Sequence, residues 1–70
     1  MRQWLVDLRQ QKKWNKAQTA KQLGITRQYY GSIESGERMK KLSVHFASKV
    51  ASVFGKKVDQ IIKMEMEAKA

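Results

Sequence analysis

The chain has 70 residues, 15 of them lysine or arginine and 6 of them acidic, so its formal net charge is +9, and it contains no cysteine or proline. A chain this short folds as one domain and has no room for a second domain with its own cofactor cleft. The absence of cysteine excludes disulfides and thiolate metal sites, and the single histidine, His45, builds no metal site by itself. We therefore expect no metal and no cofactor.

The positive charge favours a polyanionic partner, with nucleic acid first and an anionic membrane surface second. A generic solubilising surface would also be basic. The uneven placement of the cations favours a footprint for phosphates, because no acid lies between Asp7 and Glu34 or in the basic stretch over 38–57. No apolar run approaches the roughly 18 residues of a membrane span, and the first residues lack the apolar segment of a signal peptide. We expect a soluble, cytoplasmic and nucleoid-associated protein.

Helical spacing of apolar residues predicts an all-α chain, packed as one compact orthogonal bundle of five short helices in a single domain over residues 1–70. In chain order the helices are expected at residues 2–12, 16–23, 27–35, 44–54 and from 58 onward. The residues expected to face the core are Met1, Trp4, Leu5, Leu8, Ala20, Leu23, Tyr30, Ile33, Val44, Ala47, Val50, Ala51, Phe54, Val58, Ile61 and Ile62. Nothing in the chain favours a strand over these helices.

Polar residues and glycines mark the ends of the predicted helices. Asn15, followed three residues later by Gln18, is a capping-box pattern that starts the second helix. Gly24 ends that helix, because glycine adopts a left-handed conformation without steric penalty. Residues 63–70 alternate methionine with acidic residues. They are expected either to fray or to offer their methionines as adaptable apolar contacts to a partner.

The stretch over residues 16–35 has the spacing of two helices joined by a tight turn. Ala20 lies four residues before Gly24. Where two helices cross at about 90–120°, the crossing point needs a small side chain, and the turn needs a residue that is free to take a positive φ. Ala20 and Gly24 meet these two needs, so the spacing predicts a helix-turn-helix motif.

The segment Asn15–Arg38, NKAQTAKQLGITRQYYGSIESGER, resembles the helix-turn-helix of the phage repressor and Cro-like transcriptional regulators, the XRE family. The pair Leu8-Arg9 before the motif and the apolar pairs of the last two helices after it resemble this family as well. Together the resemblance covers about residues 5–62. It implies a lambda repressor-like DNA-binding domain whose second motif helix, at about 27–35, lies in the major groove of DNA.

In this family, base edges are read by the first residues of that helix and by those one turn later. The matching positions here are Thr26, Arg27, Gln28, Tyr29 and Ser32. Arg27 can form a bidentate pair with a guanine, and Gln28 with an adenine. Tyr29 can pack on a thymine methyl group or reach a phosphate. The resemblance therefore implies that these five residues contact bases.

Phosphate contacts set the register of such a domain on DNA without reading its sequence. The residues that the resemblance implies for them are Lys16, Ser35, Arg38, Lys40 and Lys41. Lys16 stands where the family commonly has glutamine, and Ser35 stands where it often has asparagine. The loop that follows the motif is longer than the common pattern. Two alternatives therefore stay open for its lysines, contact with phosphate or exposure to solvent.

Arg9 and Glu34 match an arginine of the first helix and a glutamate of the third helix that often pair in the family. We therefore expect a partly buried structural ion pair that fixes the angle between these helices, and we do not assign Glu34 as a catalytic acid. Two other positions depart from the family pattern. Thr19 replaces a large aliphatic residue, and Gly31 leaves a bare patch close to the DNA.

No residue pattern favours an enzyme or a small-molecule substrate, because paired carboxylates in an apolar setting, a cysteine nucleophile and a glycine-rich phosphate loop are all absent. The sequence predicts a sequence-specific regulator that binds a double-stranded DNA operator as a homodimer. The alternative is an antitoxin or antirepressor-type protein-interaction module on the same fold. A membrane-surface helix does not fit, since the cations are scattered over several helices and the last helix is acidic.

Overall fold

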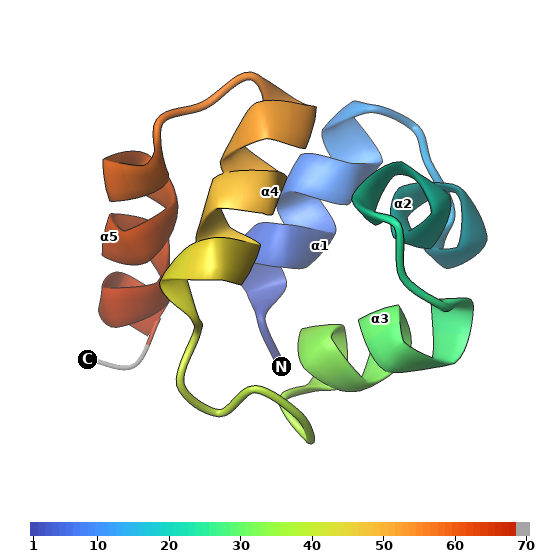
Figure 1. The fold of residues 1–70 in the computed structure, drawn as a ribbon, viewed down its shortest axis with the longest axis horizontal. Coiled ribbons are helices and arrows are strands. Elements are labelled where there is room, and N and C mark those ends of the chain that lie inside the picture. Colours follow the sequence, from blue (N-terminus) through green and yellow to red (C-terminus); the bar gives the residue numbers. More distant parts are fainter. Residues whose placement is uncertain (69–70) are drawn as a thin grey trace.

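The computed structural model describes residues 1–68, which form five helices and no strand (Figure 1). The helices are α1 (Gln3–Gln11), α2 (Lys16–Leu23), α3 (Arg27–Ser35), α4 (Val44–Phe54) and α5 (Val58–Ala68). The all-α prediction is confirmed, and the predicted bounds of α2, α3 and α4 agree with the structure. Helix α5 continues to Ala68, into the stretch for which fraying was one expectation, and positions 69–70 of that stretch lie outside the described residues.

Side chains cap three helices at their first turns. The Asn15 side chain accepts the Gln18 N–H at 2.7 Å, and the Gln18 side chain accepts the Asn15 N–H at 2.8 Å, so the capping box of α2 is closed. Thr26 and Ser43 cap α3 and α4, each by accepting a backbone N–H at 3.1 Å. These bonds satisfy N–H groups that a helix leaves unpaired, which is why the three helices begin where the sequence predicts.

The core draws on every helix. Its largest fully buried side chains are Tyr30, Leu5, Ile33, Ile61, Val50 and Thr19. Thr19 is tolerated in this position because its hydroxyl donates to the Asn15 carbonyl at 2.9 Å. Trp14, in the connection between α1 and α2, packs its ring against that of Phe54 with the ring centroids 5.6 Å apart, which closes the core on that side.

Two residues that were expected to face the core are exposed, Met1 by 80% and Val44 by 66%. Met1 precedes α1 instead of continuing its apolar face. Val44 is the first residue of α4, and helical side chains point back toward the helix N-terminus. Its side chain therefore projects beyond the start of the helix. Phe46, which was not predicted as a core residue, is 4% exposed and belongs to the core cluster.

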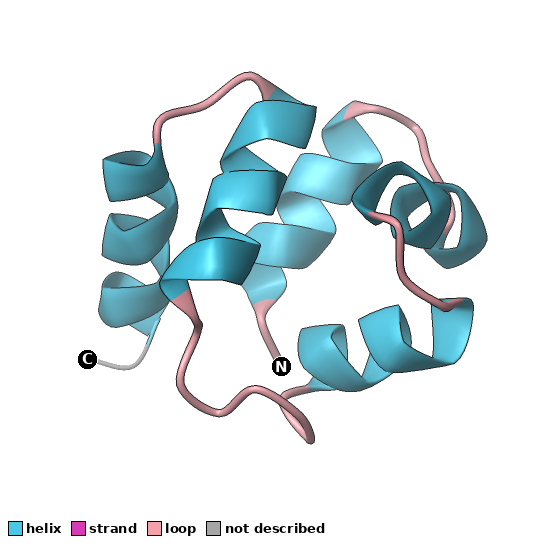
Figure 2. Ribbon diagram, viewed as in Figure 1, coloured by secondary structure: helices cyan, strands magenta, loops and turns pink. Residues whose placement is uncertain are grey.

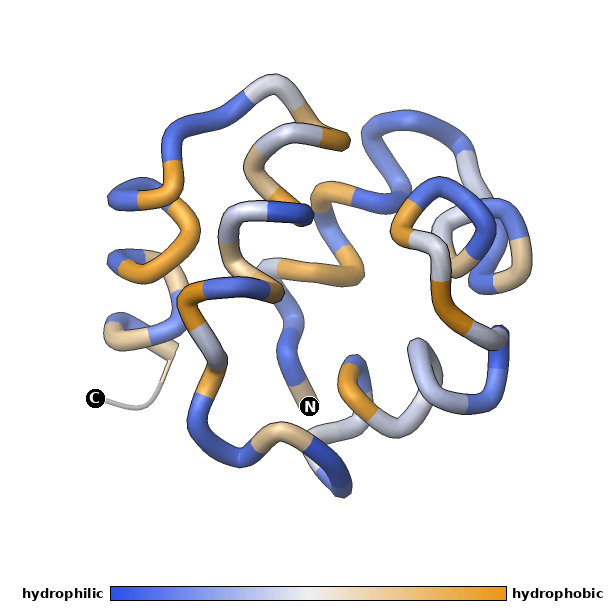
Figure 3. The backbone as a smooth tube through the Cα atoms, in the orientation of Figure 1, coloured by the Kyte–Doolittle hydropathy of each residue, from blue (hydrophilic) through white to orange (hydrophobic). Residues whose placement is uncertain are grey.

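Helix α4 packs against α5 on one side of the molecule, and α2 packs against α3 on the other (Figure 1). Helix α1 contacts both α5 and α3, so it joins the two pairs. The loop over 36–43 connects α3 to α4 (Figure 2). Hydrophilic residues follow much of this loop and the connection between α1 and α2 (Figure 3). Helix α3 and its following loop thus form one polar edge of the molecule.

Candidate nucleic-acid interface

A three-residue connection turns the chain from α2 into α3. Gly24 takes the left-handed conformation, with φ 72° and ψ 29°, and the following Ile25 N–H donates to the Ala20 carbonyl at 3.0 Å. A Cβ atom added to Gly24 would meet no atom within 4 Å. Glycine is therefore required by the backbone conformation, and not by crowding. Ala20, 2% exposed, is the small buried residue that the motif needs.

The outer side of α3 gathers most of the residues predicted to contact bases. One shallow pocket of about 340 Å³ is lined by Thr26, Gln28, Tyr29, Ser32 and Arg38. Arg27 is exposed on the same helix. The inner side of α3 carries Tyr30 and Ile33, both 0% exposed. One face of α3 is thus fixed in the core, while the other is open to a partner.

The hydroxyl groups of Thr26, Ser32 and Ser35 already make hydrogen bonds within the chain. Thr26 Oγ1 accepts the Tyr29 N–H, so its own proton remains available to an acceptor. Ser32 Oγ donates to the Gln28 carbonyl at 3.1 Å, and Ser35 Oγ donates to the Ser32 carbonyl at 3.0 Å. Since a phosphate oxygen only accepts, either serine would have to release its carbonyl before it could donate to one.

The predicted phosphate-contacting cations lie at both ends of the motif. Lys16 begins α2, with its side chain 46% exposed and its Nζ 4.0 Å from Glu34 Oε1. Arg38, Lys40 and Lys41 are exposed in the loop after α3. The guanidinium carbon of Arg38 lies 5.9 Å from the centre of the Tyr29 ring, within cation–π distance. The Arg38 N–H donates to the Ser32 carbonyl at 3.1 Å, so this loop folds back onto α3.

Arg9 and Glu34 form an ion pair between α1 and α3. Arg9 Nε lies 3.0 Å from Glu34 Oε2, and the two side chains are 14% and 3% exposed. Arg9 also donates to the Trp14 carbonyl at 3.1 Å, and the Tyr30 hydroxyl donates to Glu34 Oε2 at 2.7 Å. The hydrogen bond to Glu34 raises the pKa of Arg9, and burial followed by the bond to Glu34 raises the pKa of Tyr30. The pair ties α3 to α1.

A second buried ion pair was not predicted. Arg2 and Glu65 are 5% and 6% exposed, and Arg2 Nη2 lies 2.9 Å from Glu65 Oε2. Trp4 Nε1 donates to Glu65 Oε1 at 3.0 Å. One signal was available in the sequence, because Glu65 follows the core residue Ile61 by one helical turn and a charged residue on an inward face needs a partner. The acidic end of α5 therefore points partly into the molecule.

Other kinds of site find little support in the part of the chain that the structure describes. No group of three or more histidine, cysteine, aspartate or glutamate residues within 1–68 could hold a metal ion. His45 is exposed on α4. Among the described helices, none is long and apolar enough to cross a membrane.

A family model described as Helix-turn-helix matches residues 5–61. The chain belongs to the XRE family of helix-turn-helix proteins. The resemblance to repressor and Cro-like regulators is thereby confirmed at the level of the family, whose members are DNA-binding regulators and generally not enzymes. No curated protein and no solved structure matches the chain. In this XRE-family domain the matched region runs from Leu5 of α1 to Ile61 of α5.

Proposed function

We propose that this XRE-family protein is a sequence-specific transcriptional regulator of the phage repressor/Cro type, which reads double-stranded DNA in the major groove with α3. The observation that carries the proposal is the division of α3. Its inner face is buried in the core, and its outer face gathers polar side chains beside Arg38. An α-helix fits the major groove, where arginine and amide side chains match the hydrogen-bonding edges of bases. The proposal includes no catalysis, no cofactor and no small-molecule substrate.

Two groups of side chains have different roles in this proposal. The base-contacting residues are Thr26, Arg27, Gln28, Tyr29 and Ser32. The phosphate-contacting residues are Lys16, Ser35, Arg38, Lys40 and Lys41. Contacts of the first group distinguish one base pair from another, whereas contacts of the second group set the register and act on every sequence alike. A protein of this kind works in the cytoplasm on the nucleoid.

The two roles are separated by a pair of substitutions at exposed positions. Arg27→Ala should reduce the preference for the selected operator by about 1–3 kcal/mol at a single base pair, because one bidentate contact is lost. Lys16→Ala should weaken binding to operator and to random duplex equally, and should lower the slope of log K against log salt by about 0.9. The operator is first selected from a random duplex pool, and affinities are then measured by fluorescence anisotropy at several salt concentrations.

Identical behaviour of the two variants on operator and random DNA would contradict these roles. Gln28→Ala provides a second case, with the loss confined to a different base pair. If the unaltered protein binds no duplex at any salt concentration but forms a tight complex with another protein, the antitoxin or antirepressor alternative replaces the regulator.

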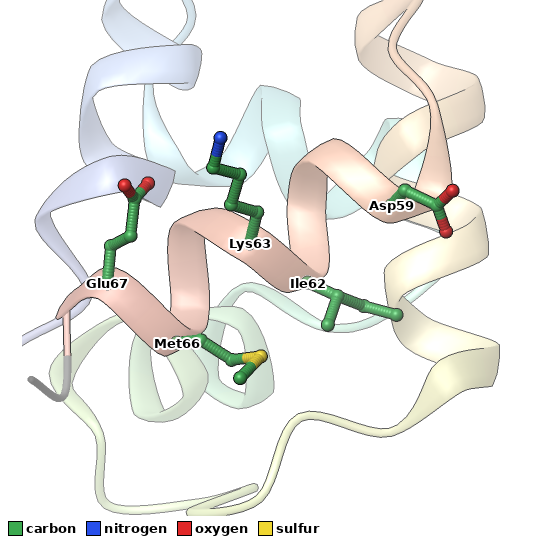
Figure 4. A pocket seen from close by; sticks show the side chains of 5 residues that line it. All are labelled: Asp59, Ile62, Lys63, Met66 and Glu67. Carbon is green, nitrogen blue, oxygen red and sulfur yellow. The ribbon is translucent and has the colours of Figure 1, made fainter.

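The proposed homodimer has a candidate surface on α5. An apolar groove of about 400 Å³ is lined by Asp59, Ile62, Lys63, Met66 and Glu67 (Figure 4). Met66 is 68% exposed, although methionine is a hydrophobic residue. The proposed occupant of this groove is the α5 of a second copy. Two domains held about 34–36 Å apart would then reach successive major grooves on one face of the DNA.

The charges around the groove support a pairing with a second copy. Lys63 and Glu67 lie one helical turn apart on α5, beside the exposed Met66 (Figure 4). An antiparallel pairing of two α5 helices can place Lys63 of each copy opposite Glu67 of the other. Such an isologous contact is self-complementary in charge, as a two-fold dimer requires. Its apolar centre would be formed by Ile62 and Met66.

Charge reversal tests this interface. Lys63→Glu should abolish the dimer, because it places acids opposite acids, and the double variant Lys63→Glu/Glu67→Lys should restore it. Mass in solution is measured by sedimentation with and without operator. A one-to-one complex on a two-fold operator would contradict the dimer, and failure of the double variant to recover would contradict this pairing.

A further inference from the structure

Arg2 is a buried arginine whose side chain joins three separate segments of the chain. It is 5% exposed. On one side, its Nε donates to both carboxylate oxygens of Glu65 on α5, at 3.1 and 3.0 Å, and its Nη2 donates to Glu65 Oε2 at 2.9 Å. Trp4 Nε1 holds the same carboxylate at 3.0 Å. Glu65 is thus fixed by donors from the start of the chain, and Arg2 is oriented by Glu65.

The other side of the Arg2 guanidinium faces the end of α3. Nη1 donates to the Ile33 carbonyl at 2.6 Å, and the Arg2 backbone N–H donates to the Glu34 carbonyl at 2.7 Å. Both carbonyls belong to the last turn of a helix, where carbonyl groups have no partner within the helix and carry partial negative charge. Arg2 fixes this end of α3 with its guanidinium at the Ile33 carbonyl, which also accepts the Gly36 N–H at 3.2 Å, and with its backbone N–H at the Glu34 carbonyl.

The same guanidinium also holds the loop after α3. Nη1 donates to the Arg38 carbonyl at 3.3 Å, and Nη2 donates to the Met39 carbonyl. Met39 has a φ of 55°, in the left-handed region that non-glycine residues rarely adopt, so the loop needs support in this conformation. Arg2 supplies that support at the two residues that lead into Lys40 and Lys41.

The loop conformation decides where its cations stand relative to α3. Arg38 lies over the Tyr29 ring and lines the pocket of the outer α3 face, with its backbone N–H on the Ser32 carbonyl. Arg2 donates to the Arg38 carbonyl, but it is itself buried and unable to touch DNA. Its effect on a DNA partner would therefore pass through the loop.

We infer that Arg2, oriented by Glu65, is a positioning residue that holds the loop over 36–43 against α3 and so places Arg38, Lys40 and Lys41 for phosphate contact. The inference rests on the proposed DNA binding by α3. It goes beyond that proposal, because it assigns part of the DNA affinity to a buried ion pair between the start of the chain and α5. Base reading by the first turn of α3 does not depend on it.

The informative variant is Arg2→Met/Glu65→Gln. It removes both buried charges together, so no unpaired charge remains in the core, and glutamine still offers Trp4 an acceptor. In the free protein, the Arg38 amide should exchange its hydrogen about tenfold faster or more, while the amides of α2 keep their protection. On DNA, the slope of log K against log salt should become shallower by about 1–3, at about 0.9 per phosphate contact. The ratio of operator to random affinity should stay the same.

A merely structural role would not change the salt slope of the folded protein, so affinities are compared at a temperature where circular dichroism finds each variant fully folded. Arg2→Lys is the second variant, because one ammonium group keeps the charge opposite Glu65 but cannot reach the carbonyls of Ile33 and Met39 together. It should retain the fold and lose Arg38 protection. Gln3→Ala, an exposed change beside Arg2, is the control and should alter neither measurement.

The inference is overturned if the folded double variant and Arg2→Lys both keep the wild-type Arg38 protection, or if the salt slope of the double variant is unchanged. A fall in the operator-to-random ratio equal to the whole loss of affinity would also overturn it, since Arg2 would then act on base reading. If the unaltered protein binds no DNA, the proposed function fails. The exchange measurement still decides whether Arg2 holds the loop.

Discussion

Glu34 is the buried residue on which the packing of α3 against α1 depends. Its carboxylate receives donors from Arg9 on α1 and from Tyr30 on its own helix, and Lys16 at the start of α2 lies 4.0 Å away. The side chain is only 3% exposed. A buried charge of this kind is tolerated because every oxygen has a partner, and losing one partner costs more than a surface pair would. One carboxylate therefore joins α3 to α1, with the Lys16 ammonium of α2 close by.

Tyr30→Phe tests this arrangement through its pH dependence. At neutral pH the variant should lose about 1–3 kcal/mol of stability, because the buried Glu34 carboxylate loses one hydrogen-bond donor. Burial and the bond to Glu34 raise the pKa of Tyr30 above the ordinary 10.0, so the unfolded state releases this proton first. As the pH rises above 10, the wild type should lose up to about 1.4 kcal/mol per pH unit from this group, and the variant should not. Urea unfolding from pH 7 to 11 measures both effects.

Tyr29→Phe is the matched control, since Tyr29 is 36% exposed and its hydroxyl makes no bond to Glu34. It should leave stability at neutral pH nearly unchanged, and its alkaline loss should follow that of the wild type. If Tyr30→Phe loses as much stability at alkaline pH as the wild type does, the loss in the wild type does not come from the Tyr30 proton.

Helix α3 contains a weak helix former at its centre. Gly31 is half-buried in the middle of the helix, and a Cβ atom added there would meet nothing within 4 Å. Its backbone is helical, so neither a turn nor crowding requires glycine at this position. The free molecule would therefore tolerate alanine. A reason to retain glycine is close approach of a partner to this helix, as the proposed DNA complex provides.

Gly31→Ala should stabilise the free protein by about 0.5–1 kcal/mol, because alanine loses less backbone entropy in a helix and meets no clash. It should at the same time weaken operator binding, since the new methyl group would stand on the helix that DNA approaches in the proposed complex. Thermal unfolding and anisotropy titrations measure the two effects. Ser48→Ala, at an exposed position of α4, is the control that raises helix propensity away from the interface. Unchanged or tighter binding by Gly31→Ala would mean that this position faces away from DNA.

The bounds of the elements were predictable where capping is local. Asn15, Thr26 and Ser43 each bond a backbone N–H three residues later, and glycines end α2, α3 and α4, so a short stretch of sequence contains the whole signal. The burial of single residues was less predictable. Val44 has the right periodicity for the core, but it stands at a helix start where its side chain points past the bundle.

The candidate site was likewise predictable only in part. The outer residues of α3 were predictable, because the Ala20–Gly24 spacing places the turn and the helix period then assigns the faces. The contact of Arg2 with Glu65 was not, since 63 positions separate the two residues and only the packing of α1 against α5 brings them together. The only trace that such a long-range ion pair leaves in the sequence is a charged residue on an inward helix face.

The whole molecule has an excess of positive charge, and the two buried ion pairs leave that excess unchanged while they take two of the few acids off the surface. Of the 6 acidic residues that offset the 15 basic ones to give the net charge of +9, Glu34 and Glu65 are buried against arginines. Their charges are used inside the fold, so the surface is more uniformly basic than the sequence alone indicates. Such a surface attracts a polyanion over its whole extent, but it repels itself in the absence of one. Salt should therefore weaken DNA binding and stabilise the free fold.

The repulsion can be tested at a place away from α3. Lys21 on α2 and Lys49 on α4 line the same hollow of about 320 Å³, so two like charges face one space. Lys49→Glu replaces this repulsion by an attraction and should stabilise the protein by about 0.2–1 kcal/mol at low salt. The gain should shrink as salt is added, because the screening length falls to about 10 Å at 0.1 M. Lys49→Gln, which only removes the charge, should give a smaller gain with the same salt dependence. A gain that persists at high salt would assign the effect to packing in the hollow, and equal stability of all three proteins at low salt would mean that solvent already screens these lysines from each other.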